Sequence, residues 1–152
     1  MQTACDLLQI LSAAAIGLLL GALLTEGCLF VSYWRSLPAD KFYSLYKELH
    51  PRLYRYFTPI TVAPLVLSLA AGISCVALSD AGGWPIVIAF GLCLCAAATH
   101  ELYFKRANTQ FAKAVLAPDA LAAELKRWAV WHWIRTGLAV LAFGAALVSL
   151  TL

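Results

Sequence analysis

Four ionisable side chains interrupt long apolar stretches of this chain, and they are the residues best suited to chemistry: Glu26, His100, His132 and Arg135. Ionisable groups are costly in hydrocarbon and often mark functional sites there. A carboxylate, two imidazoles and a guanidinium can transfer protons or stabilise an anion. Each also has a structural alternative. For Glu26 with Arg135 it is a buried ion pair, for His132 a helix-to-helix hydrogen bond, and for His100 a position facing lipid or headgroups.

The segments that position these residues are unusually apolar. Of the 152 residues, 62% are hydrophobic and only 12% charged. Apolar stretches at residues 7–34, 54–78, 84–104 and 128–152 each supply the roughly 20 helical residues that cross a bilayer. They are continuous, not alternating, which excludes barrel strands. We therefore expect an all-α membrane protein, with residues 1–152 forming a single four-transmembrane-helix bundle.

The distribution of charge predicts the orientation of this bundle in the lipid bilayer. All eleven Lys and Arg residues lie in or beside two connections, the one after the first apolar stretch and the one after the third. Such basic loops stay in the cytoplasm, which predicts an N-out/C-out protein of a bacterial inner (plasma) membrane, with the turn at residues 79–83 outside. The net charge of +3 is too modest to indicate a nucleic-acid partner.

Prolines divide the two basic connections. Pro38 is expected to precede a short interfacial helix at residues 41–49, and Pro51 to end it, because the residue before a proline disfavours helix. His50 beside it is expected to be an exposed interfacial residue. Pro118 is expected to begin a short segment that leads into the fourth helix.

Depth in the membrane predicts a partner for Glu26. Glu26 lies nine residues before Arg35, and Arg135 lies eight residues after Arg127. At the helical rise, both side chains sit roughly 12–13 Å inside the basic boundary. Because no basic residue lies within a turn of Glu26, Arg135 is its expected partner.

Helical spacing places further candidate site residues on shared helix faces. Trp128, His132 and Arg135 share one face of the fourth helix, at spacings of four and three residues. Glu101 and Lys105 are four apart in the order that favours an ion pair, and Asn108 continues their face.

The cysteines and two of the glycines are predicted to serve helix packing. The five cysteines, Cys5, Cys28, Cys75, Cys93 and Cys95, are interpreted as small apolar packing residues and not as a disulfide framework. Gly17 and Gly21 form a small-xxx-small pair that lets another helix approach closely, either within the bundle or in a homo-oligomer.

Three stretches carry a family resemblance. Thr25–Glu26–Gly27 closes the first apolar stretch, Asn108 stands in RANTQF at residues 106–111, and residues 127–136 read RWAVWHWIRT. Together they resemble the anthrone-oxygenase-like family of small four-helix integral membrane proteins, mostly of unknown function, over nearly the whole chain. The family usually has a proline shortly before the asparagine, where this chain has Lys105, Arg106 and Ala107.

The resemblance implies an O2-dependent oxygenase acting on a polycyclic aromatic or other lipophilic small molecule at the cytoplasmic side of the bundle. In that hypothesis His132 is the catalytic base, Arg135 and Asn108 hold the developing oxyanion, and Glu26 orients one of them. Trp128 or Trp131 stacks on the substrate. This chemistry requires no metal.

Two alternatives stay open from the residues. Glu26, His100, Glu101 and His132 supply nitrogen and oxygen donors that suit iron or copper. The competing class is a non-enzymatic small membrane subunit or assembly partner of a larger complex, in which the buried polar groups only hold helices together.

Overall fold

The computed structural model describes residues 2–78 and 81–152 of the chain, and every regular element within them is helical. Four helical spans in this part of the chain are long and apolar enough to cross a membrane: Gln2–Ser36, Ala39–Ala77, Gly83–Ala112 and Pro118–Ser149. The expected all-α architecture with four candidate transmembrane helices is confirmed.

Two of the four spans contain a π-helical segment. The first span consists of α1 (Gln2–Thr25), the π-helix η1 (Glu26–Val31) and α2 (Ser32–Ser36). The second is α3 (Ala39–Ala77). The third consists of α4 (Gly83–Thr99), the π-helix η2 (His100–Phe104) and α5 (Lys105–Ala112), and the fourth is α6 (Pro118–Ser149).

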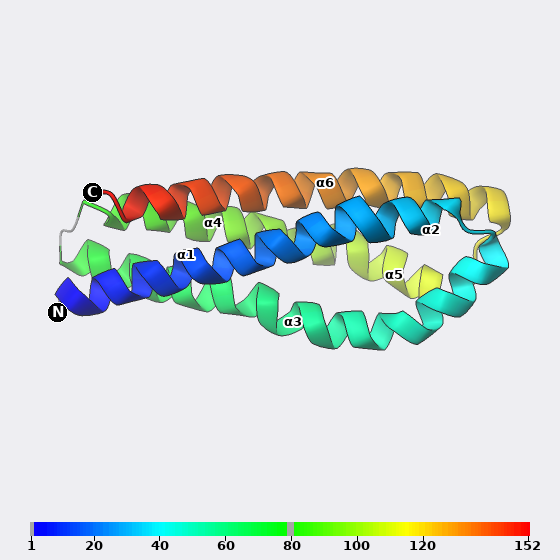
Figure 1. The fold of residues 1–152 in the computed structure, drawn as a ribbon, viewed down its shortest axis with the longest axis horizontal. Helices are drawn as coiled ribbons and strands as arrows, with labels where there is room; N and C mark the ends of the chain where they lie inside the picture. Colours follow the sequence, from blue (N-terminus) through cyan, green and yellow to red (C-terminus); the bar gives the residue numbers. More distant parts are fainter. Residues whose placement is uncertain (1, 79–80) are drawn as a thin grey trace.

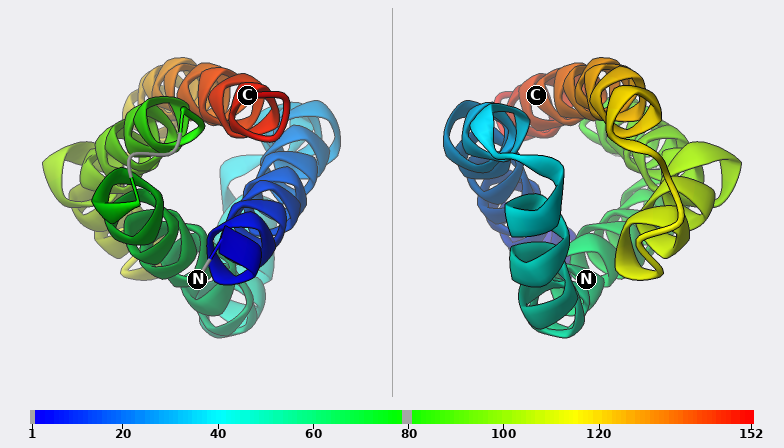
Figure 2. Two further views of the ribbon diagram at one scale, coloured as in Figure 1. Left: turned by 90° about the vertical axis from the view of Figure 1, so that its left-hand side faces the viewer. Right: turned by 90° about the vertical axis from the view of Figure 1, so that its right-hand side faces the viewer.

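The spans form an up-and-down ring (Figures 1 and 2), in which α1 packs on α3, α3 on α4, α4 on α6, and α6 on α1. Both termini lie at one end, and the connections at residues 37–38 and 113–117 lie at the other. We call these the terminal end and the basic end. Of the predicted turn at residues 79–83, Ser79 and Asp80 lie outside the described residues.

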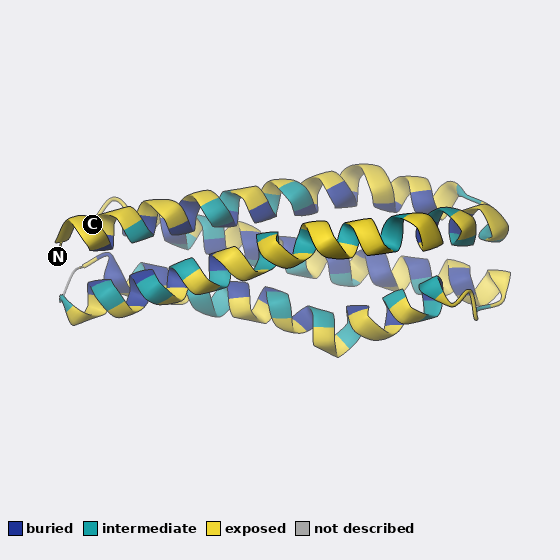
Figure 3. Cartoon of the chain, turned by 90° about the horizontal axis from the view of Figure 1, so that it is seen from below, coloured by how far each residue is buried: buried dark blue, intermediate teal, exposed yellow. Residues whose placement is uncertain are grey.

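The two ends are packed differently. Toward the terminal end the core consists largely of small side chains, among them Ala13, Ala71, Ala89 and Ala142. Toward the basic end it is aromatic, with Trp34, Phe42, Tyr46, Phe104, Phe111 and Trp128. Large apolar side chains such as Leu18, Ile73 and Leu141 are exposed, and Figure 3 shows exposed residues along the length of the helices. Contiguous exposure of this kind fits a lipid-facing surface better than a water-facing one.

The prediction that Pro51 ends a separate interfacial helix is wrong. Residues 39–77 form one helix that contains Pro51, Pro59 and Pro64. Each proline removes a backbone hydrogen bond and its ring pushes against the preceding turn, which bends a helix without necessarily ending it. Figure 1 shows α3 bowed over this stretch.

Two further boundaries differ from the sequence expectation. The third span continues through α5 to Ala112, beyond the predicted end at residue 104. Pro118 starts α6 itself and not a separate segment, because a proline is well suited to the first helical position, where its missing N–H is not needed.

The cysteine prediction is wrong for one pair. Cys5 and Cys75 form a disulfide, with their Cα atoms 5.3 Å apart across 70 residues of sequence. They meet because the start of α1 lies beside the end of the antiparallel α3. Cys28, Cys93 and Cys95 are free thiols. Gly17 serves packing within the bundle, since a Cβ there would lie 3.1 Å from the Phe143 ring on α6.

Removing this disulfide is expected to lower stability. Cys5→Ser should reduce the free energy of unfolding by about 2–4 kcal/mol, since the bond closes a long loop. Thermal unfolding in detergent, under oxidising conditions, measures the effect. The Cys95→Ser variant, which changes an exposed free thiol, should behave like the unmodified chain. Equal stability of the Cys5→Ser variant would contradict the linkage.

Candidate functional site

A cavity of about 330 Å³ lies between α3 and the other three spans, toward the basic end. Its wall is mostly apolar and aromatic, with contributions from Trp34, Leu53, Phe57 and Trp128. Its polar lining residues include Glu26, His50, His100, Glu101, Asn108 and Arg135. A largely apolar cavity with a few convergent polar groups is the usual form of a small-molecule site.

The bend in α3 accounts for the position of this cavity. The lining residues on α3 run from Tyr46 to Leu65, which is the stretch that holds Pro51, Pro59 and Pro64. A helix bent by prolines moves away from its neighbours over that stretch. The prolines therefore shape the space that the other spans line with polar groups.

The expected ion pair between Glu26 and Arg135 is present. Arg135 Nη2 donates to Glu26 Oε2 at 2.7 Å, and Glu26 is only 5% exposed. The pair joins η1 to α6, and both residues line the cavity. Charge-assisted hydrogen bonds of this length are among the stronger polar contacts in proteins.

His132 lies behind this pair and not on the cavity wall. It is fully buried, its ring stacks on Trp128 at 5.2 Å between centroids, and its Nε2 lies 2.9 Å from the carbonyl oxygen of Leu23. A carbonyl can only accept, so Nε2 carries the proton and donates. Nδ1 then accepts from Arg135 Nη2 at 3.0 Å.

The hydrogen bonds of His132 do not fit its predicted role as the catalytic base. Its donor and its acceptor are both used inside the protein, by Leu23 and by Arg135. It orients the Arg135 guanidinium and is not positioned to take a proton from a molecule in the cavity.

Two buried N–H groups of the cavity wall have no hydrogen-bond partner among the described residues. They are Arg135 Nε and Trp34 Nε1. The Arg135 guanidinium is also held over the Phe104 ring, 4.2 Å from its centroid, which fixes its plane. Buried donors are normally satisfied, so these two residues of the cavity wall each carry a hydrogen-bonding capacity that the described chain leaves unused.

Asn108 adds a third donor. Trp128 Nε1 donates to Asn108 Oδ1 at 2.9 Å, so the amide oxygen of Asn108 is used by the protein. Its NH2 group makes no hydrogen bond to a described residue. Asn108, Trp128 and Arg135, which were expected to surround one site, all line this cavity.

The π-helical segments place two ionisable groups at the cavity. Glu26 is the first residue of η1, and His100 is the first residue of η2. A π-turn adds a residue to a helical turn and rotates the residues after it, and such segments are frequent at functional sites. The apolar pattern of the sequence carries no signal for them.

The remaining candidates separate into those at the cavity and those elsewhere. His100 is half-buried at the wall, and its imidazole makes no hydrogen bond to a described residue. Glu101 pairs with Lys105 at 2.7 Å on the surface, as expected. His50 is half-buried against the Tyr46 ring and lines the cavity, which corrects the expectation of an exposed residue. Trp131 does not line the cavity and stacks on Tyr103 instead.

The proposed metal donors do not assemble. Within residues 2–78 and 81–152, no group of three or more His, Cys, Asp or Glu side chains is placed to hold a metal ion. Glu26 and His132 are each engaged with Arg135, and Glu101 is engaged with Lys105. The donor set Glu26, His100, Glu101 and His132 is not supported.

Sequence reasoning missed two residues of the site. The position of Trp34 at the end of the first apolar stretch suggests an interfacial aromatic residue, yet Trp34 is buried in the cavity wall. Gly27 allows the close approach of α6, because a Cβ there would lie 2.8 Å from His132 Nε2. In the sequence, this close approach was signalled by the glycine directly after Glu26.

Comparison of the chain with protein-family models, curated proteins and solved structures gives no match.

The Glu26–Arg135 pair is expected to be energetically coupled. Glu26→Gln or Arg135→Met alone leaves one buried charge unpaired, which costs about 3–5 kcal/mol. The double variant leaves neither charge and should cost much less than the two single changes together. Denaturant unfolding of the four proteins in detergent measures the coupling. Strictly additive losses would refute it.

Gly27→Ala should displace His132, because the new methyl group would overlap its ring and crowd the Trp133 ring. We expect a loss of roughly 1–3 kcal/mol by overpacking. Gly21→Ala is the matched control on the same span, since nothing lies within 4 Å of a Cβ there. Melting temperatures of both variants test this, and equal values would remove the proposed contact.

Proposed function

We propose that the chain is a multi-pass membrane oxygenase that binds a polycyclic phenolic molecule, of the anthrone type, in the cavity toward the basic end. The observation that carries the proposal is that Arg135 and Trp34, two residues lining a largely apolar and partly aromatic cavity, each have a buried N–H group, Nε and Nε1, without a hydrogen-bond partner among the described residues. Such a wall suits a flat lipophilic ring system that bears an oxygen acceptor.

The residues divide the proposed chemistry between them. His100, with its unengaged imidazole on the wall, removes the proton from the substrate as general base. Arg135, Asn108 and Trp34 donate to the oxyanion that develops. Glu26 and His132 act as positioning residues, because both hold the Arg135 guanidinium through hydrogen bonds.

Trp128 offers the substrate only part of its surface. One face of the indole is covered by the stacked His132 ring, so contact with a ligand is through the other face or the edge. Trp131 has no part in this proposal, since it lies outside the cavity.

The reaction balances with molecular oxygen alone. The electron-rich anion transfers electrons to O2, and the methylene carbon loses two hydrogens and gains one oxygen atom as a carbonyl. The second oxygen atom leaves as water with those two hydrogens. The substrate supplies all four electrons, so no further reductant is required.

In the proposed orientation the chain spans a bacterial inner (plasma) membrane, and its basic end faces the cytoplasm. Apart from Arg135, every Lys and Arg residue lies at residues 35–55 or 105–127, the segments that contain or flank the two connections of that end. The Cys5–Cys75 disulfide lies at the opposite, terminal end. Disulfides persist in the oxidising space outside the cytoplasm, so both features support the same orientation.

The runner-up is a non-enzymatic subunit of a larger membrane complex. The hydrogen-bonded chain from Glu26 through Arg135 and His132 to Leu23 favours it, because these groups connect the first span to α6. Under this alternative the cavity would be filled by a partner or by lipid.

The enzyme proposal predicts anthrone-dependent oxygen uptake by the purified protein, with one O2 consumed per quinone formed. His100→Ala should lower kcat by about 10²–10⁴-fold, the usual contribution of a general base. Asn108→Ala should also lower it, while Thr109→Ala, an exposed neighbour outside the cavity, should leave it unchanged. An oxygen electrode and quinone absorbance provide the measurements.

Two outcomes would contradict this. Full activity of the His100→Ala protein would remove His100 from the mechanism. Absence of turnover, together with a stoichiometric protein that co-purifies with the chain, would favour the subunit alternative.

A further inference from the structure

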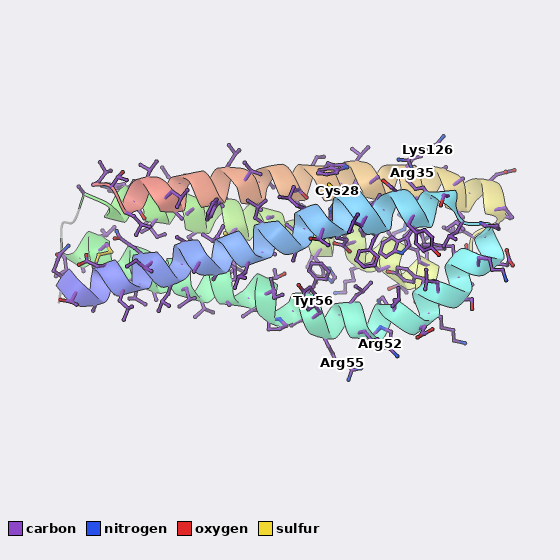
Figure 4. All side chains as sticks on the ribbon, viewed as in Figure 1. Cys28, Arg35, Arg52, Arg55, Tyr56 and Lys126 are labelled. Carbon is purple, nitrogen blue, oxygen red and sulfur yellow. A yellow bond between two sulfur atoms is a disulfide. The ribbon has the colours of Figure 1, made fainter. Side chains whose placement is uncertain are left out.

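A second concave site lies on the outer surface at the basic end, away from the central cavity. It is a groove between α2 and α6, lined by Arg35, Lys126, Ala129, Val130, Trp133 and Ile134. None of these residues lines the central cavity. Figure 4 shows Arg35 and Lys126 close together on this edge of the molecule, whereas Arg52 and Arg55 project from α3 on another side.

The two cations of the groove are unpaired. Neither the Arg35 nor the Lys126 side chain makes an ion pair or a hydrogen bond with a described residue. Three other basic residues at this end do have acidic partners, Arg52 with Glu48, Lys105 with Glu101, and Arg127 with Glu124, whereas further surface cations such as Lys41 and Lys113 form no ion pair with a described residue. No acidic residue of the described chain lines the groove. Two cations on one groove without an acidic partner suit an anionic group.

The rest of the groove is apolar. Val130, Trp133 and Ile134 lie four to eight residues beyond Lys126 on α6, and all three are exposed. Along a helix this extends roughly 6–12 Å from the charged pair toward the membrane interior. Ala129 forms a small floor between them.

Trp133 is held in a defined position within this groove. It is 46% exposed, but its inner edge packs over Gly27, and the His132 ring meets it edge-on at 5.8 Å. A fixed indole beside a basic pair is suited to one acyl chain below one headgroup, because aromatic side chains favour the boundary between headgroups and hydrocarbon.

We propose that this groove is a binding site for an anionic phospholipid. The phosphate lies between Arg35 and Lys126, and an acyl chain runs along Val130, Trp133 and Ile134. Basic pockets between membrane helices bind acidic lipid headgroups in this way. The continuous apolar strip below the cations favours a lipid over a free phosphate, which would leave that strip unused.

The test compares lipids and matched variants in detergent. Native mass spectrometry during titration with phosphatidylglycerol or phosphatidylcholine gives the Kd of each lipid. We expect tighter binding of phosphatidylglycerol, with affinity about fivefold weaker for each charge removed, so roughly 25-fold weaker in Arg35→Gln/Lys126→Gln. The control Arg52→Gln/Arg55→Gln removes the same charge from α3 and should change the Kd less than twofold.

A second measurement locates the acyl chain. Phosphatidylglycerol with brominated acyl chains should quench tryptophan fluorescence, and Trp133→Phe should remove most of that quenching without loss of the protein's fold. Inorganic phosphate at millimolar concentration should not displace the lipid. Equal Kd values for the two lipids, equal weakening in the control variant, unchanged quenching in Trp133→Phe, or displacement by phosphate would each overturn the proposal.

Discussion

The arrangement of the basic half depends on one buried ion pair. Glu26 and Arg135 are removed from water, and the cost of burying two charges is offset only when they are paired and their remaining hydrogen-bonding capacity is used. His132 and the Phe104 ring provide much of that support for Arg135. Because His132 is in turn anchored on Leu23, the pair fixes α6 against the first span in both depth and rotation.

Satisfying the pair does not use every donor. The Glu26 carboxylate and the His132 imidazole both engage Nη2 of Arg135, so Nε is left unpaired beside the space created by the prolines of α3. The geometry that satisfies the ion pair therefore leaves one buried N–H group unpaired on a residue that lines the cavity. The structural role of Arg135 and the role proposed for it in function are two aspects of one arrangement.

The sequence predicted the features that depend on hydrophobic length and on spacing within one helix. The four spans, the depth match of Glu26 with Arg135, and the Glu101–Lys105 pair all derive from such periodicity. It did not predict the Cys5–Cys75 bond, because that contact depends on the relative placement of two helices. Nor did it predict η1 and η2, whose extra residue per turn is decided by packing, or the continuation of α3 past Pro51, which local preference opposes.

The charge balance of the cavity constrains the ligand of the proposed reaction. Glu26 compensates Arg135, and Glu101 compensates Lys105, so these residues offer no uncompensated positive charge to an anion in the ground state. Neutral phenols and ketones therefore fit better than permanent anions. In the proposed reaction, the spare donors of Arg135, Trp34 and Asn108 would interact most strongly when negative charge develops on the substrate oxygen. Stabilisation that grows along the reaction is what raises kcat, whereas equal binding of ground and transition states does not.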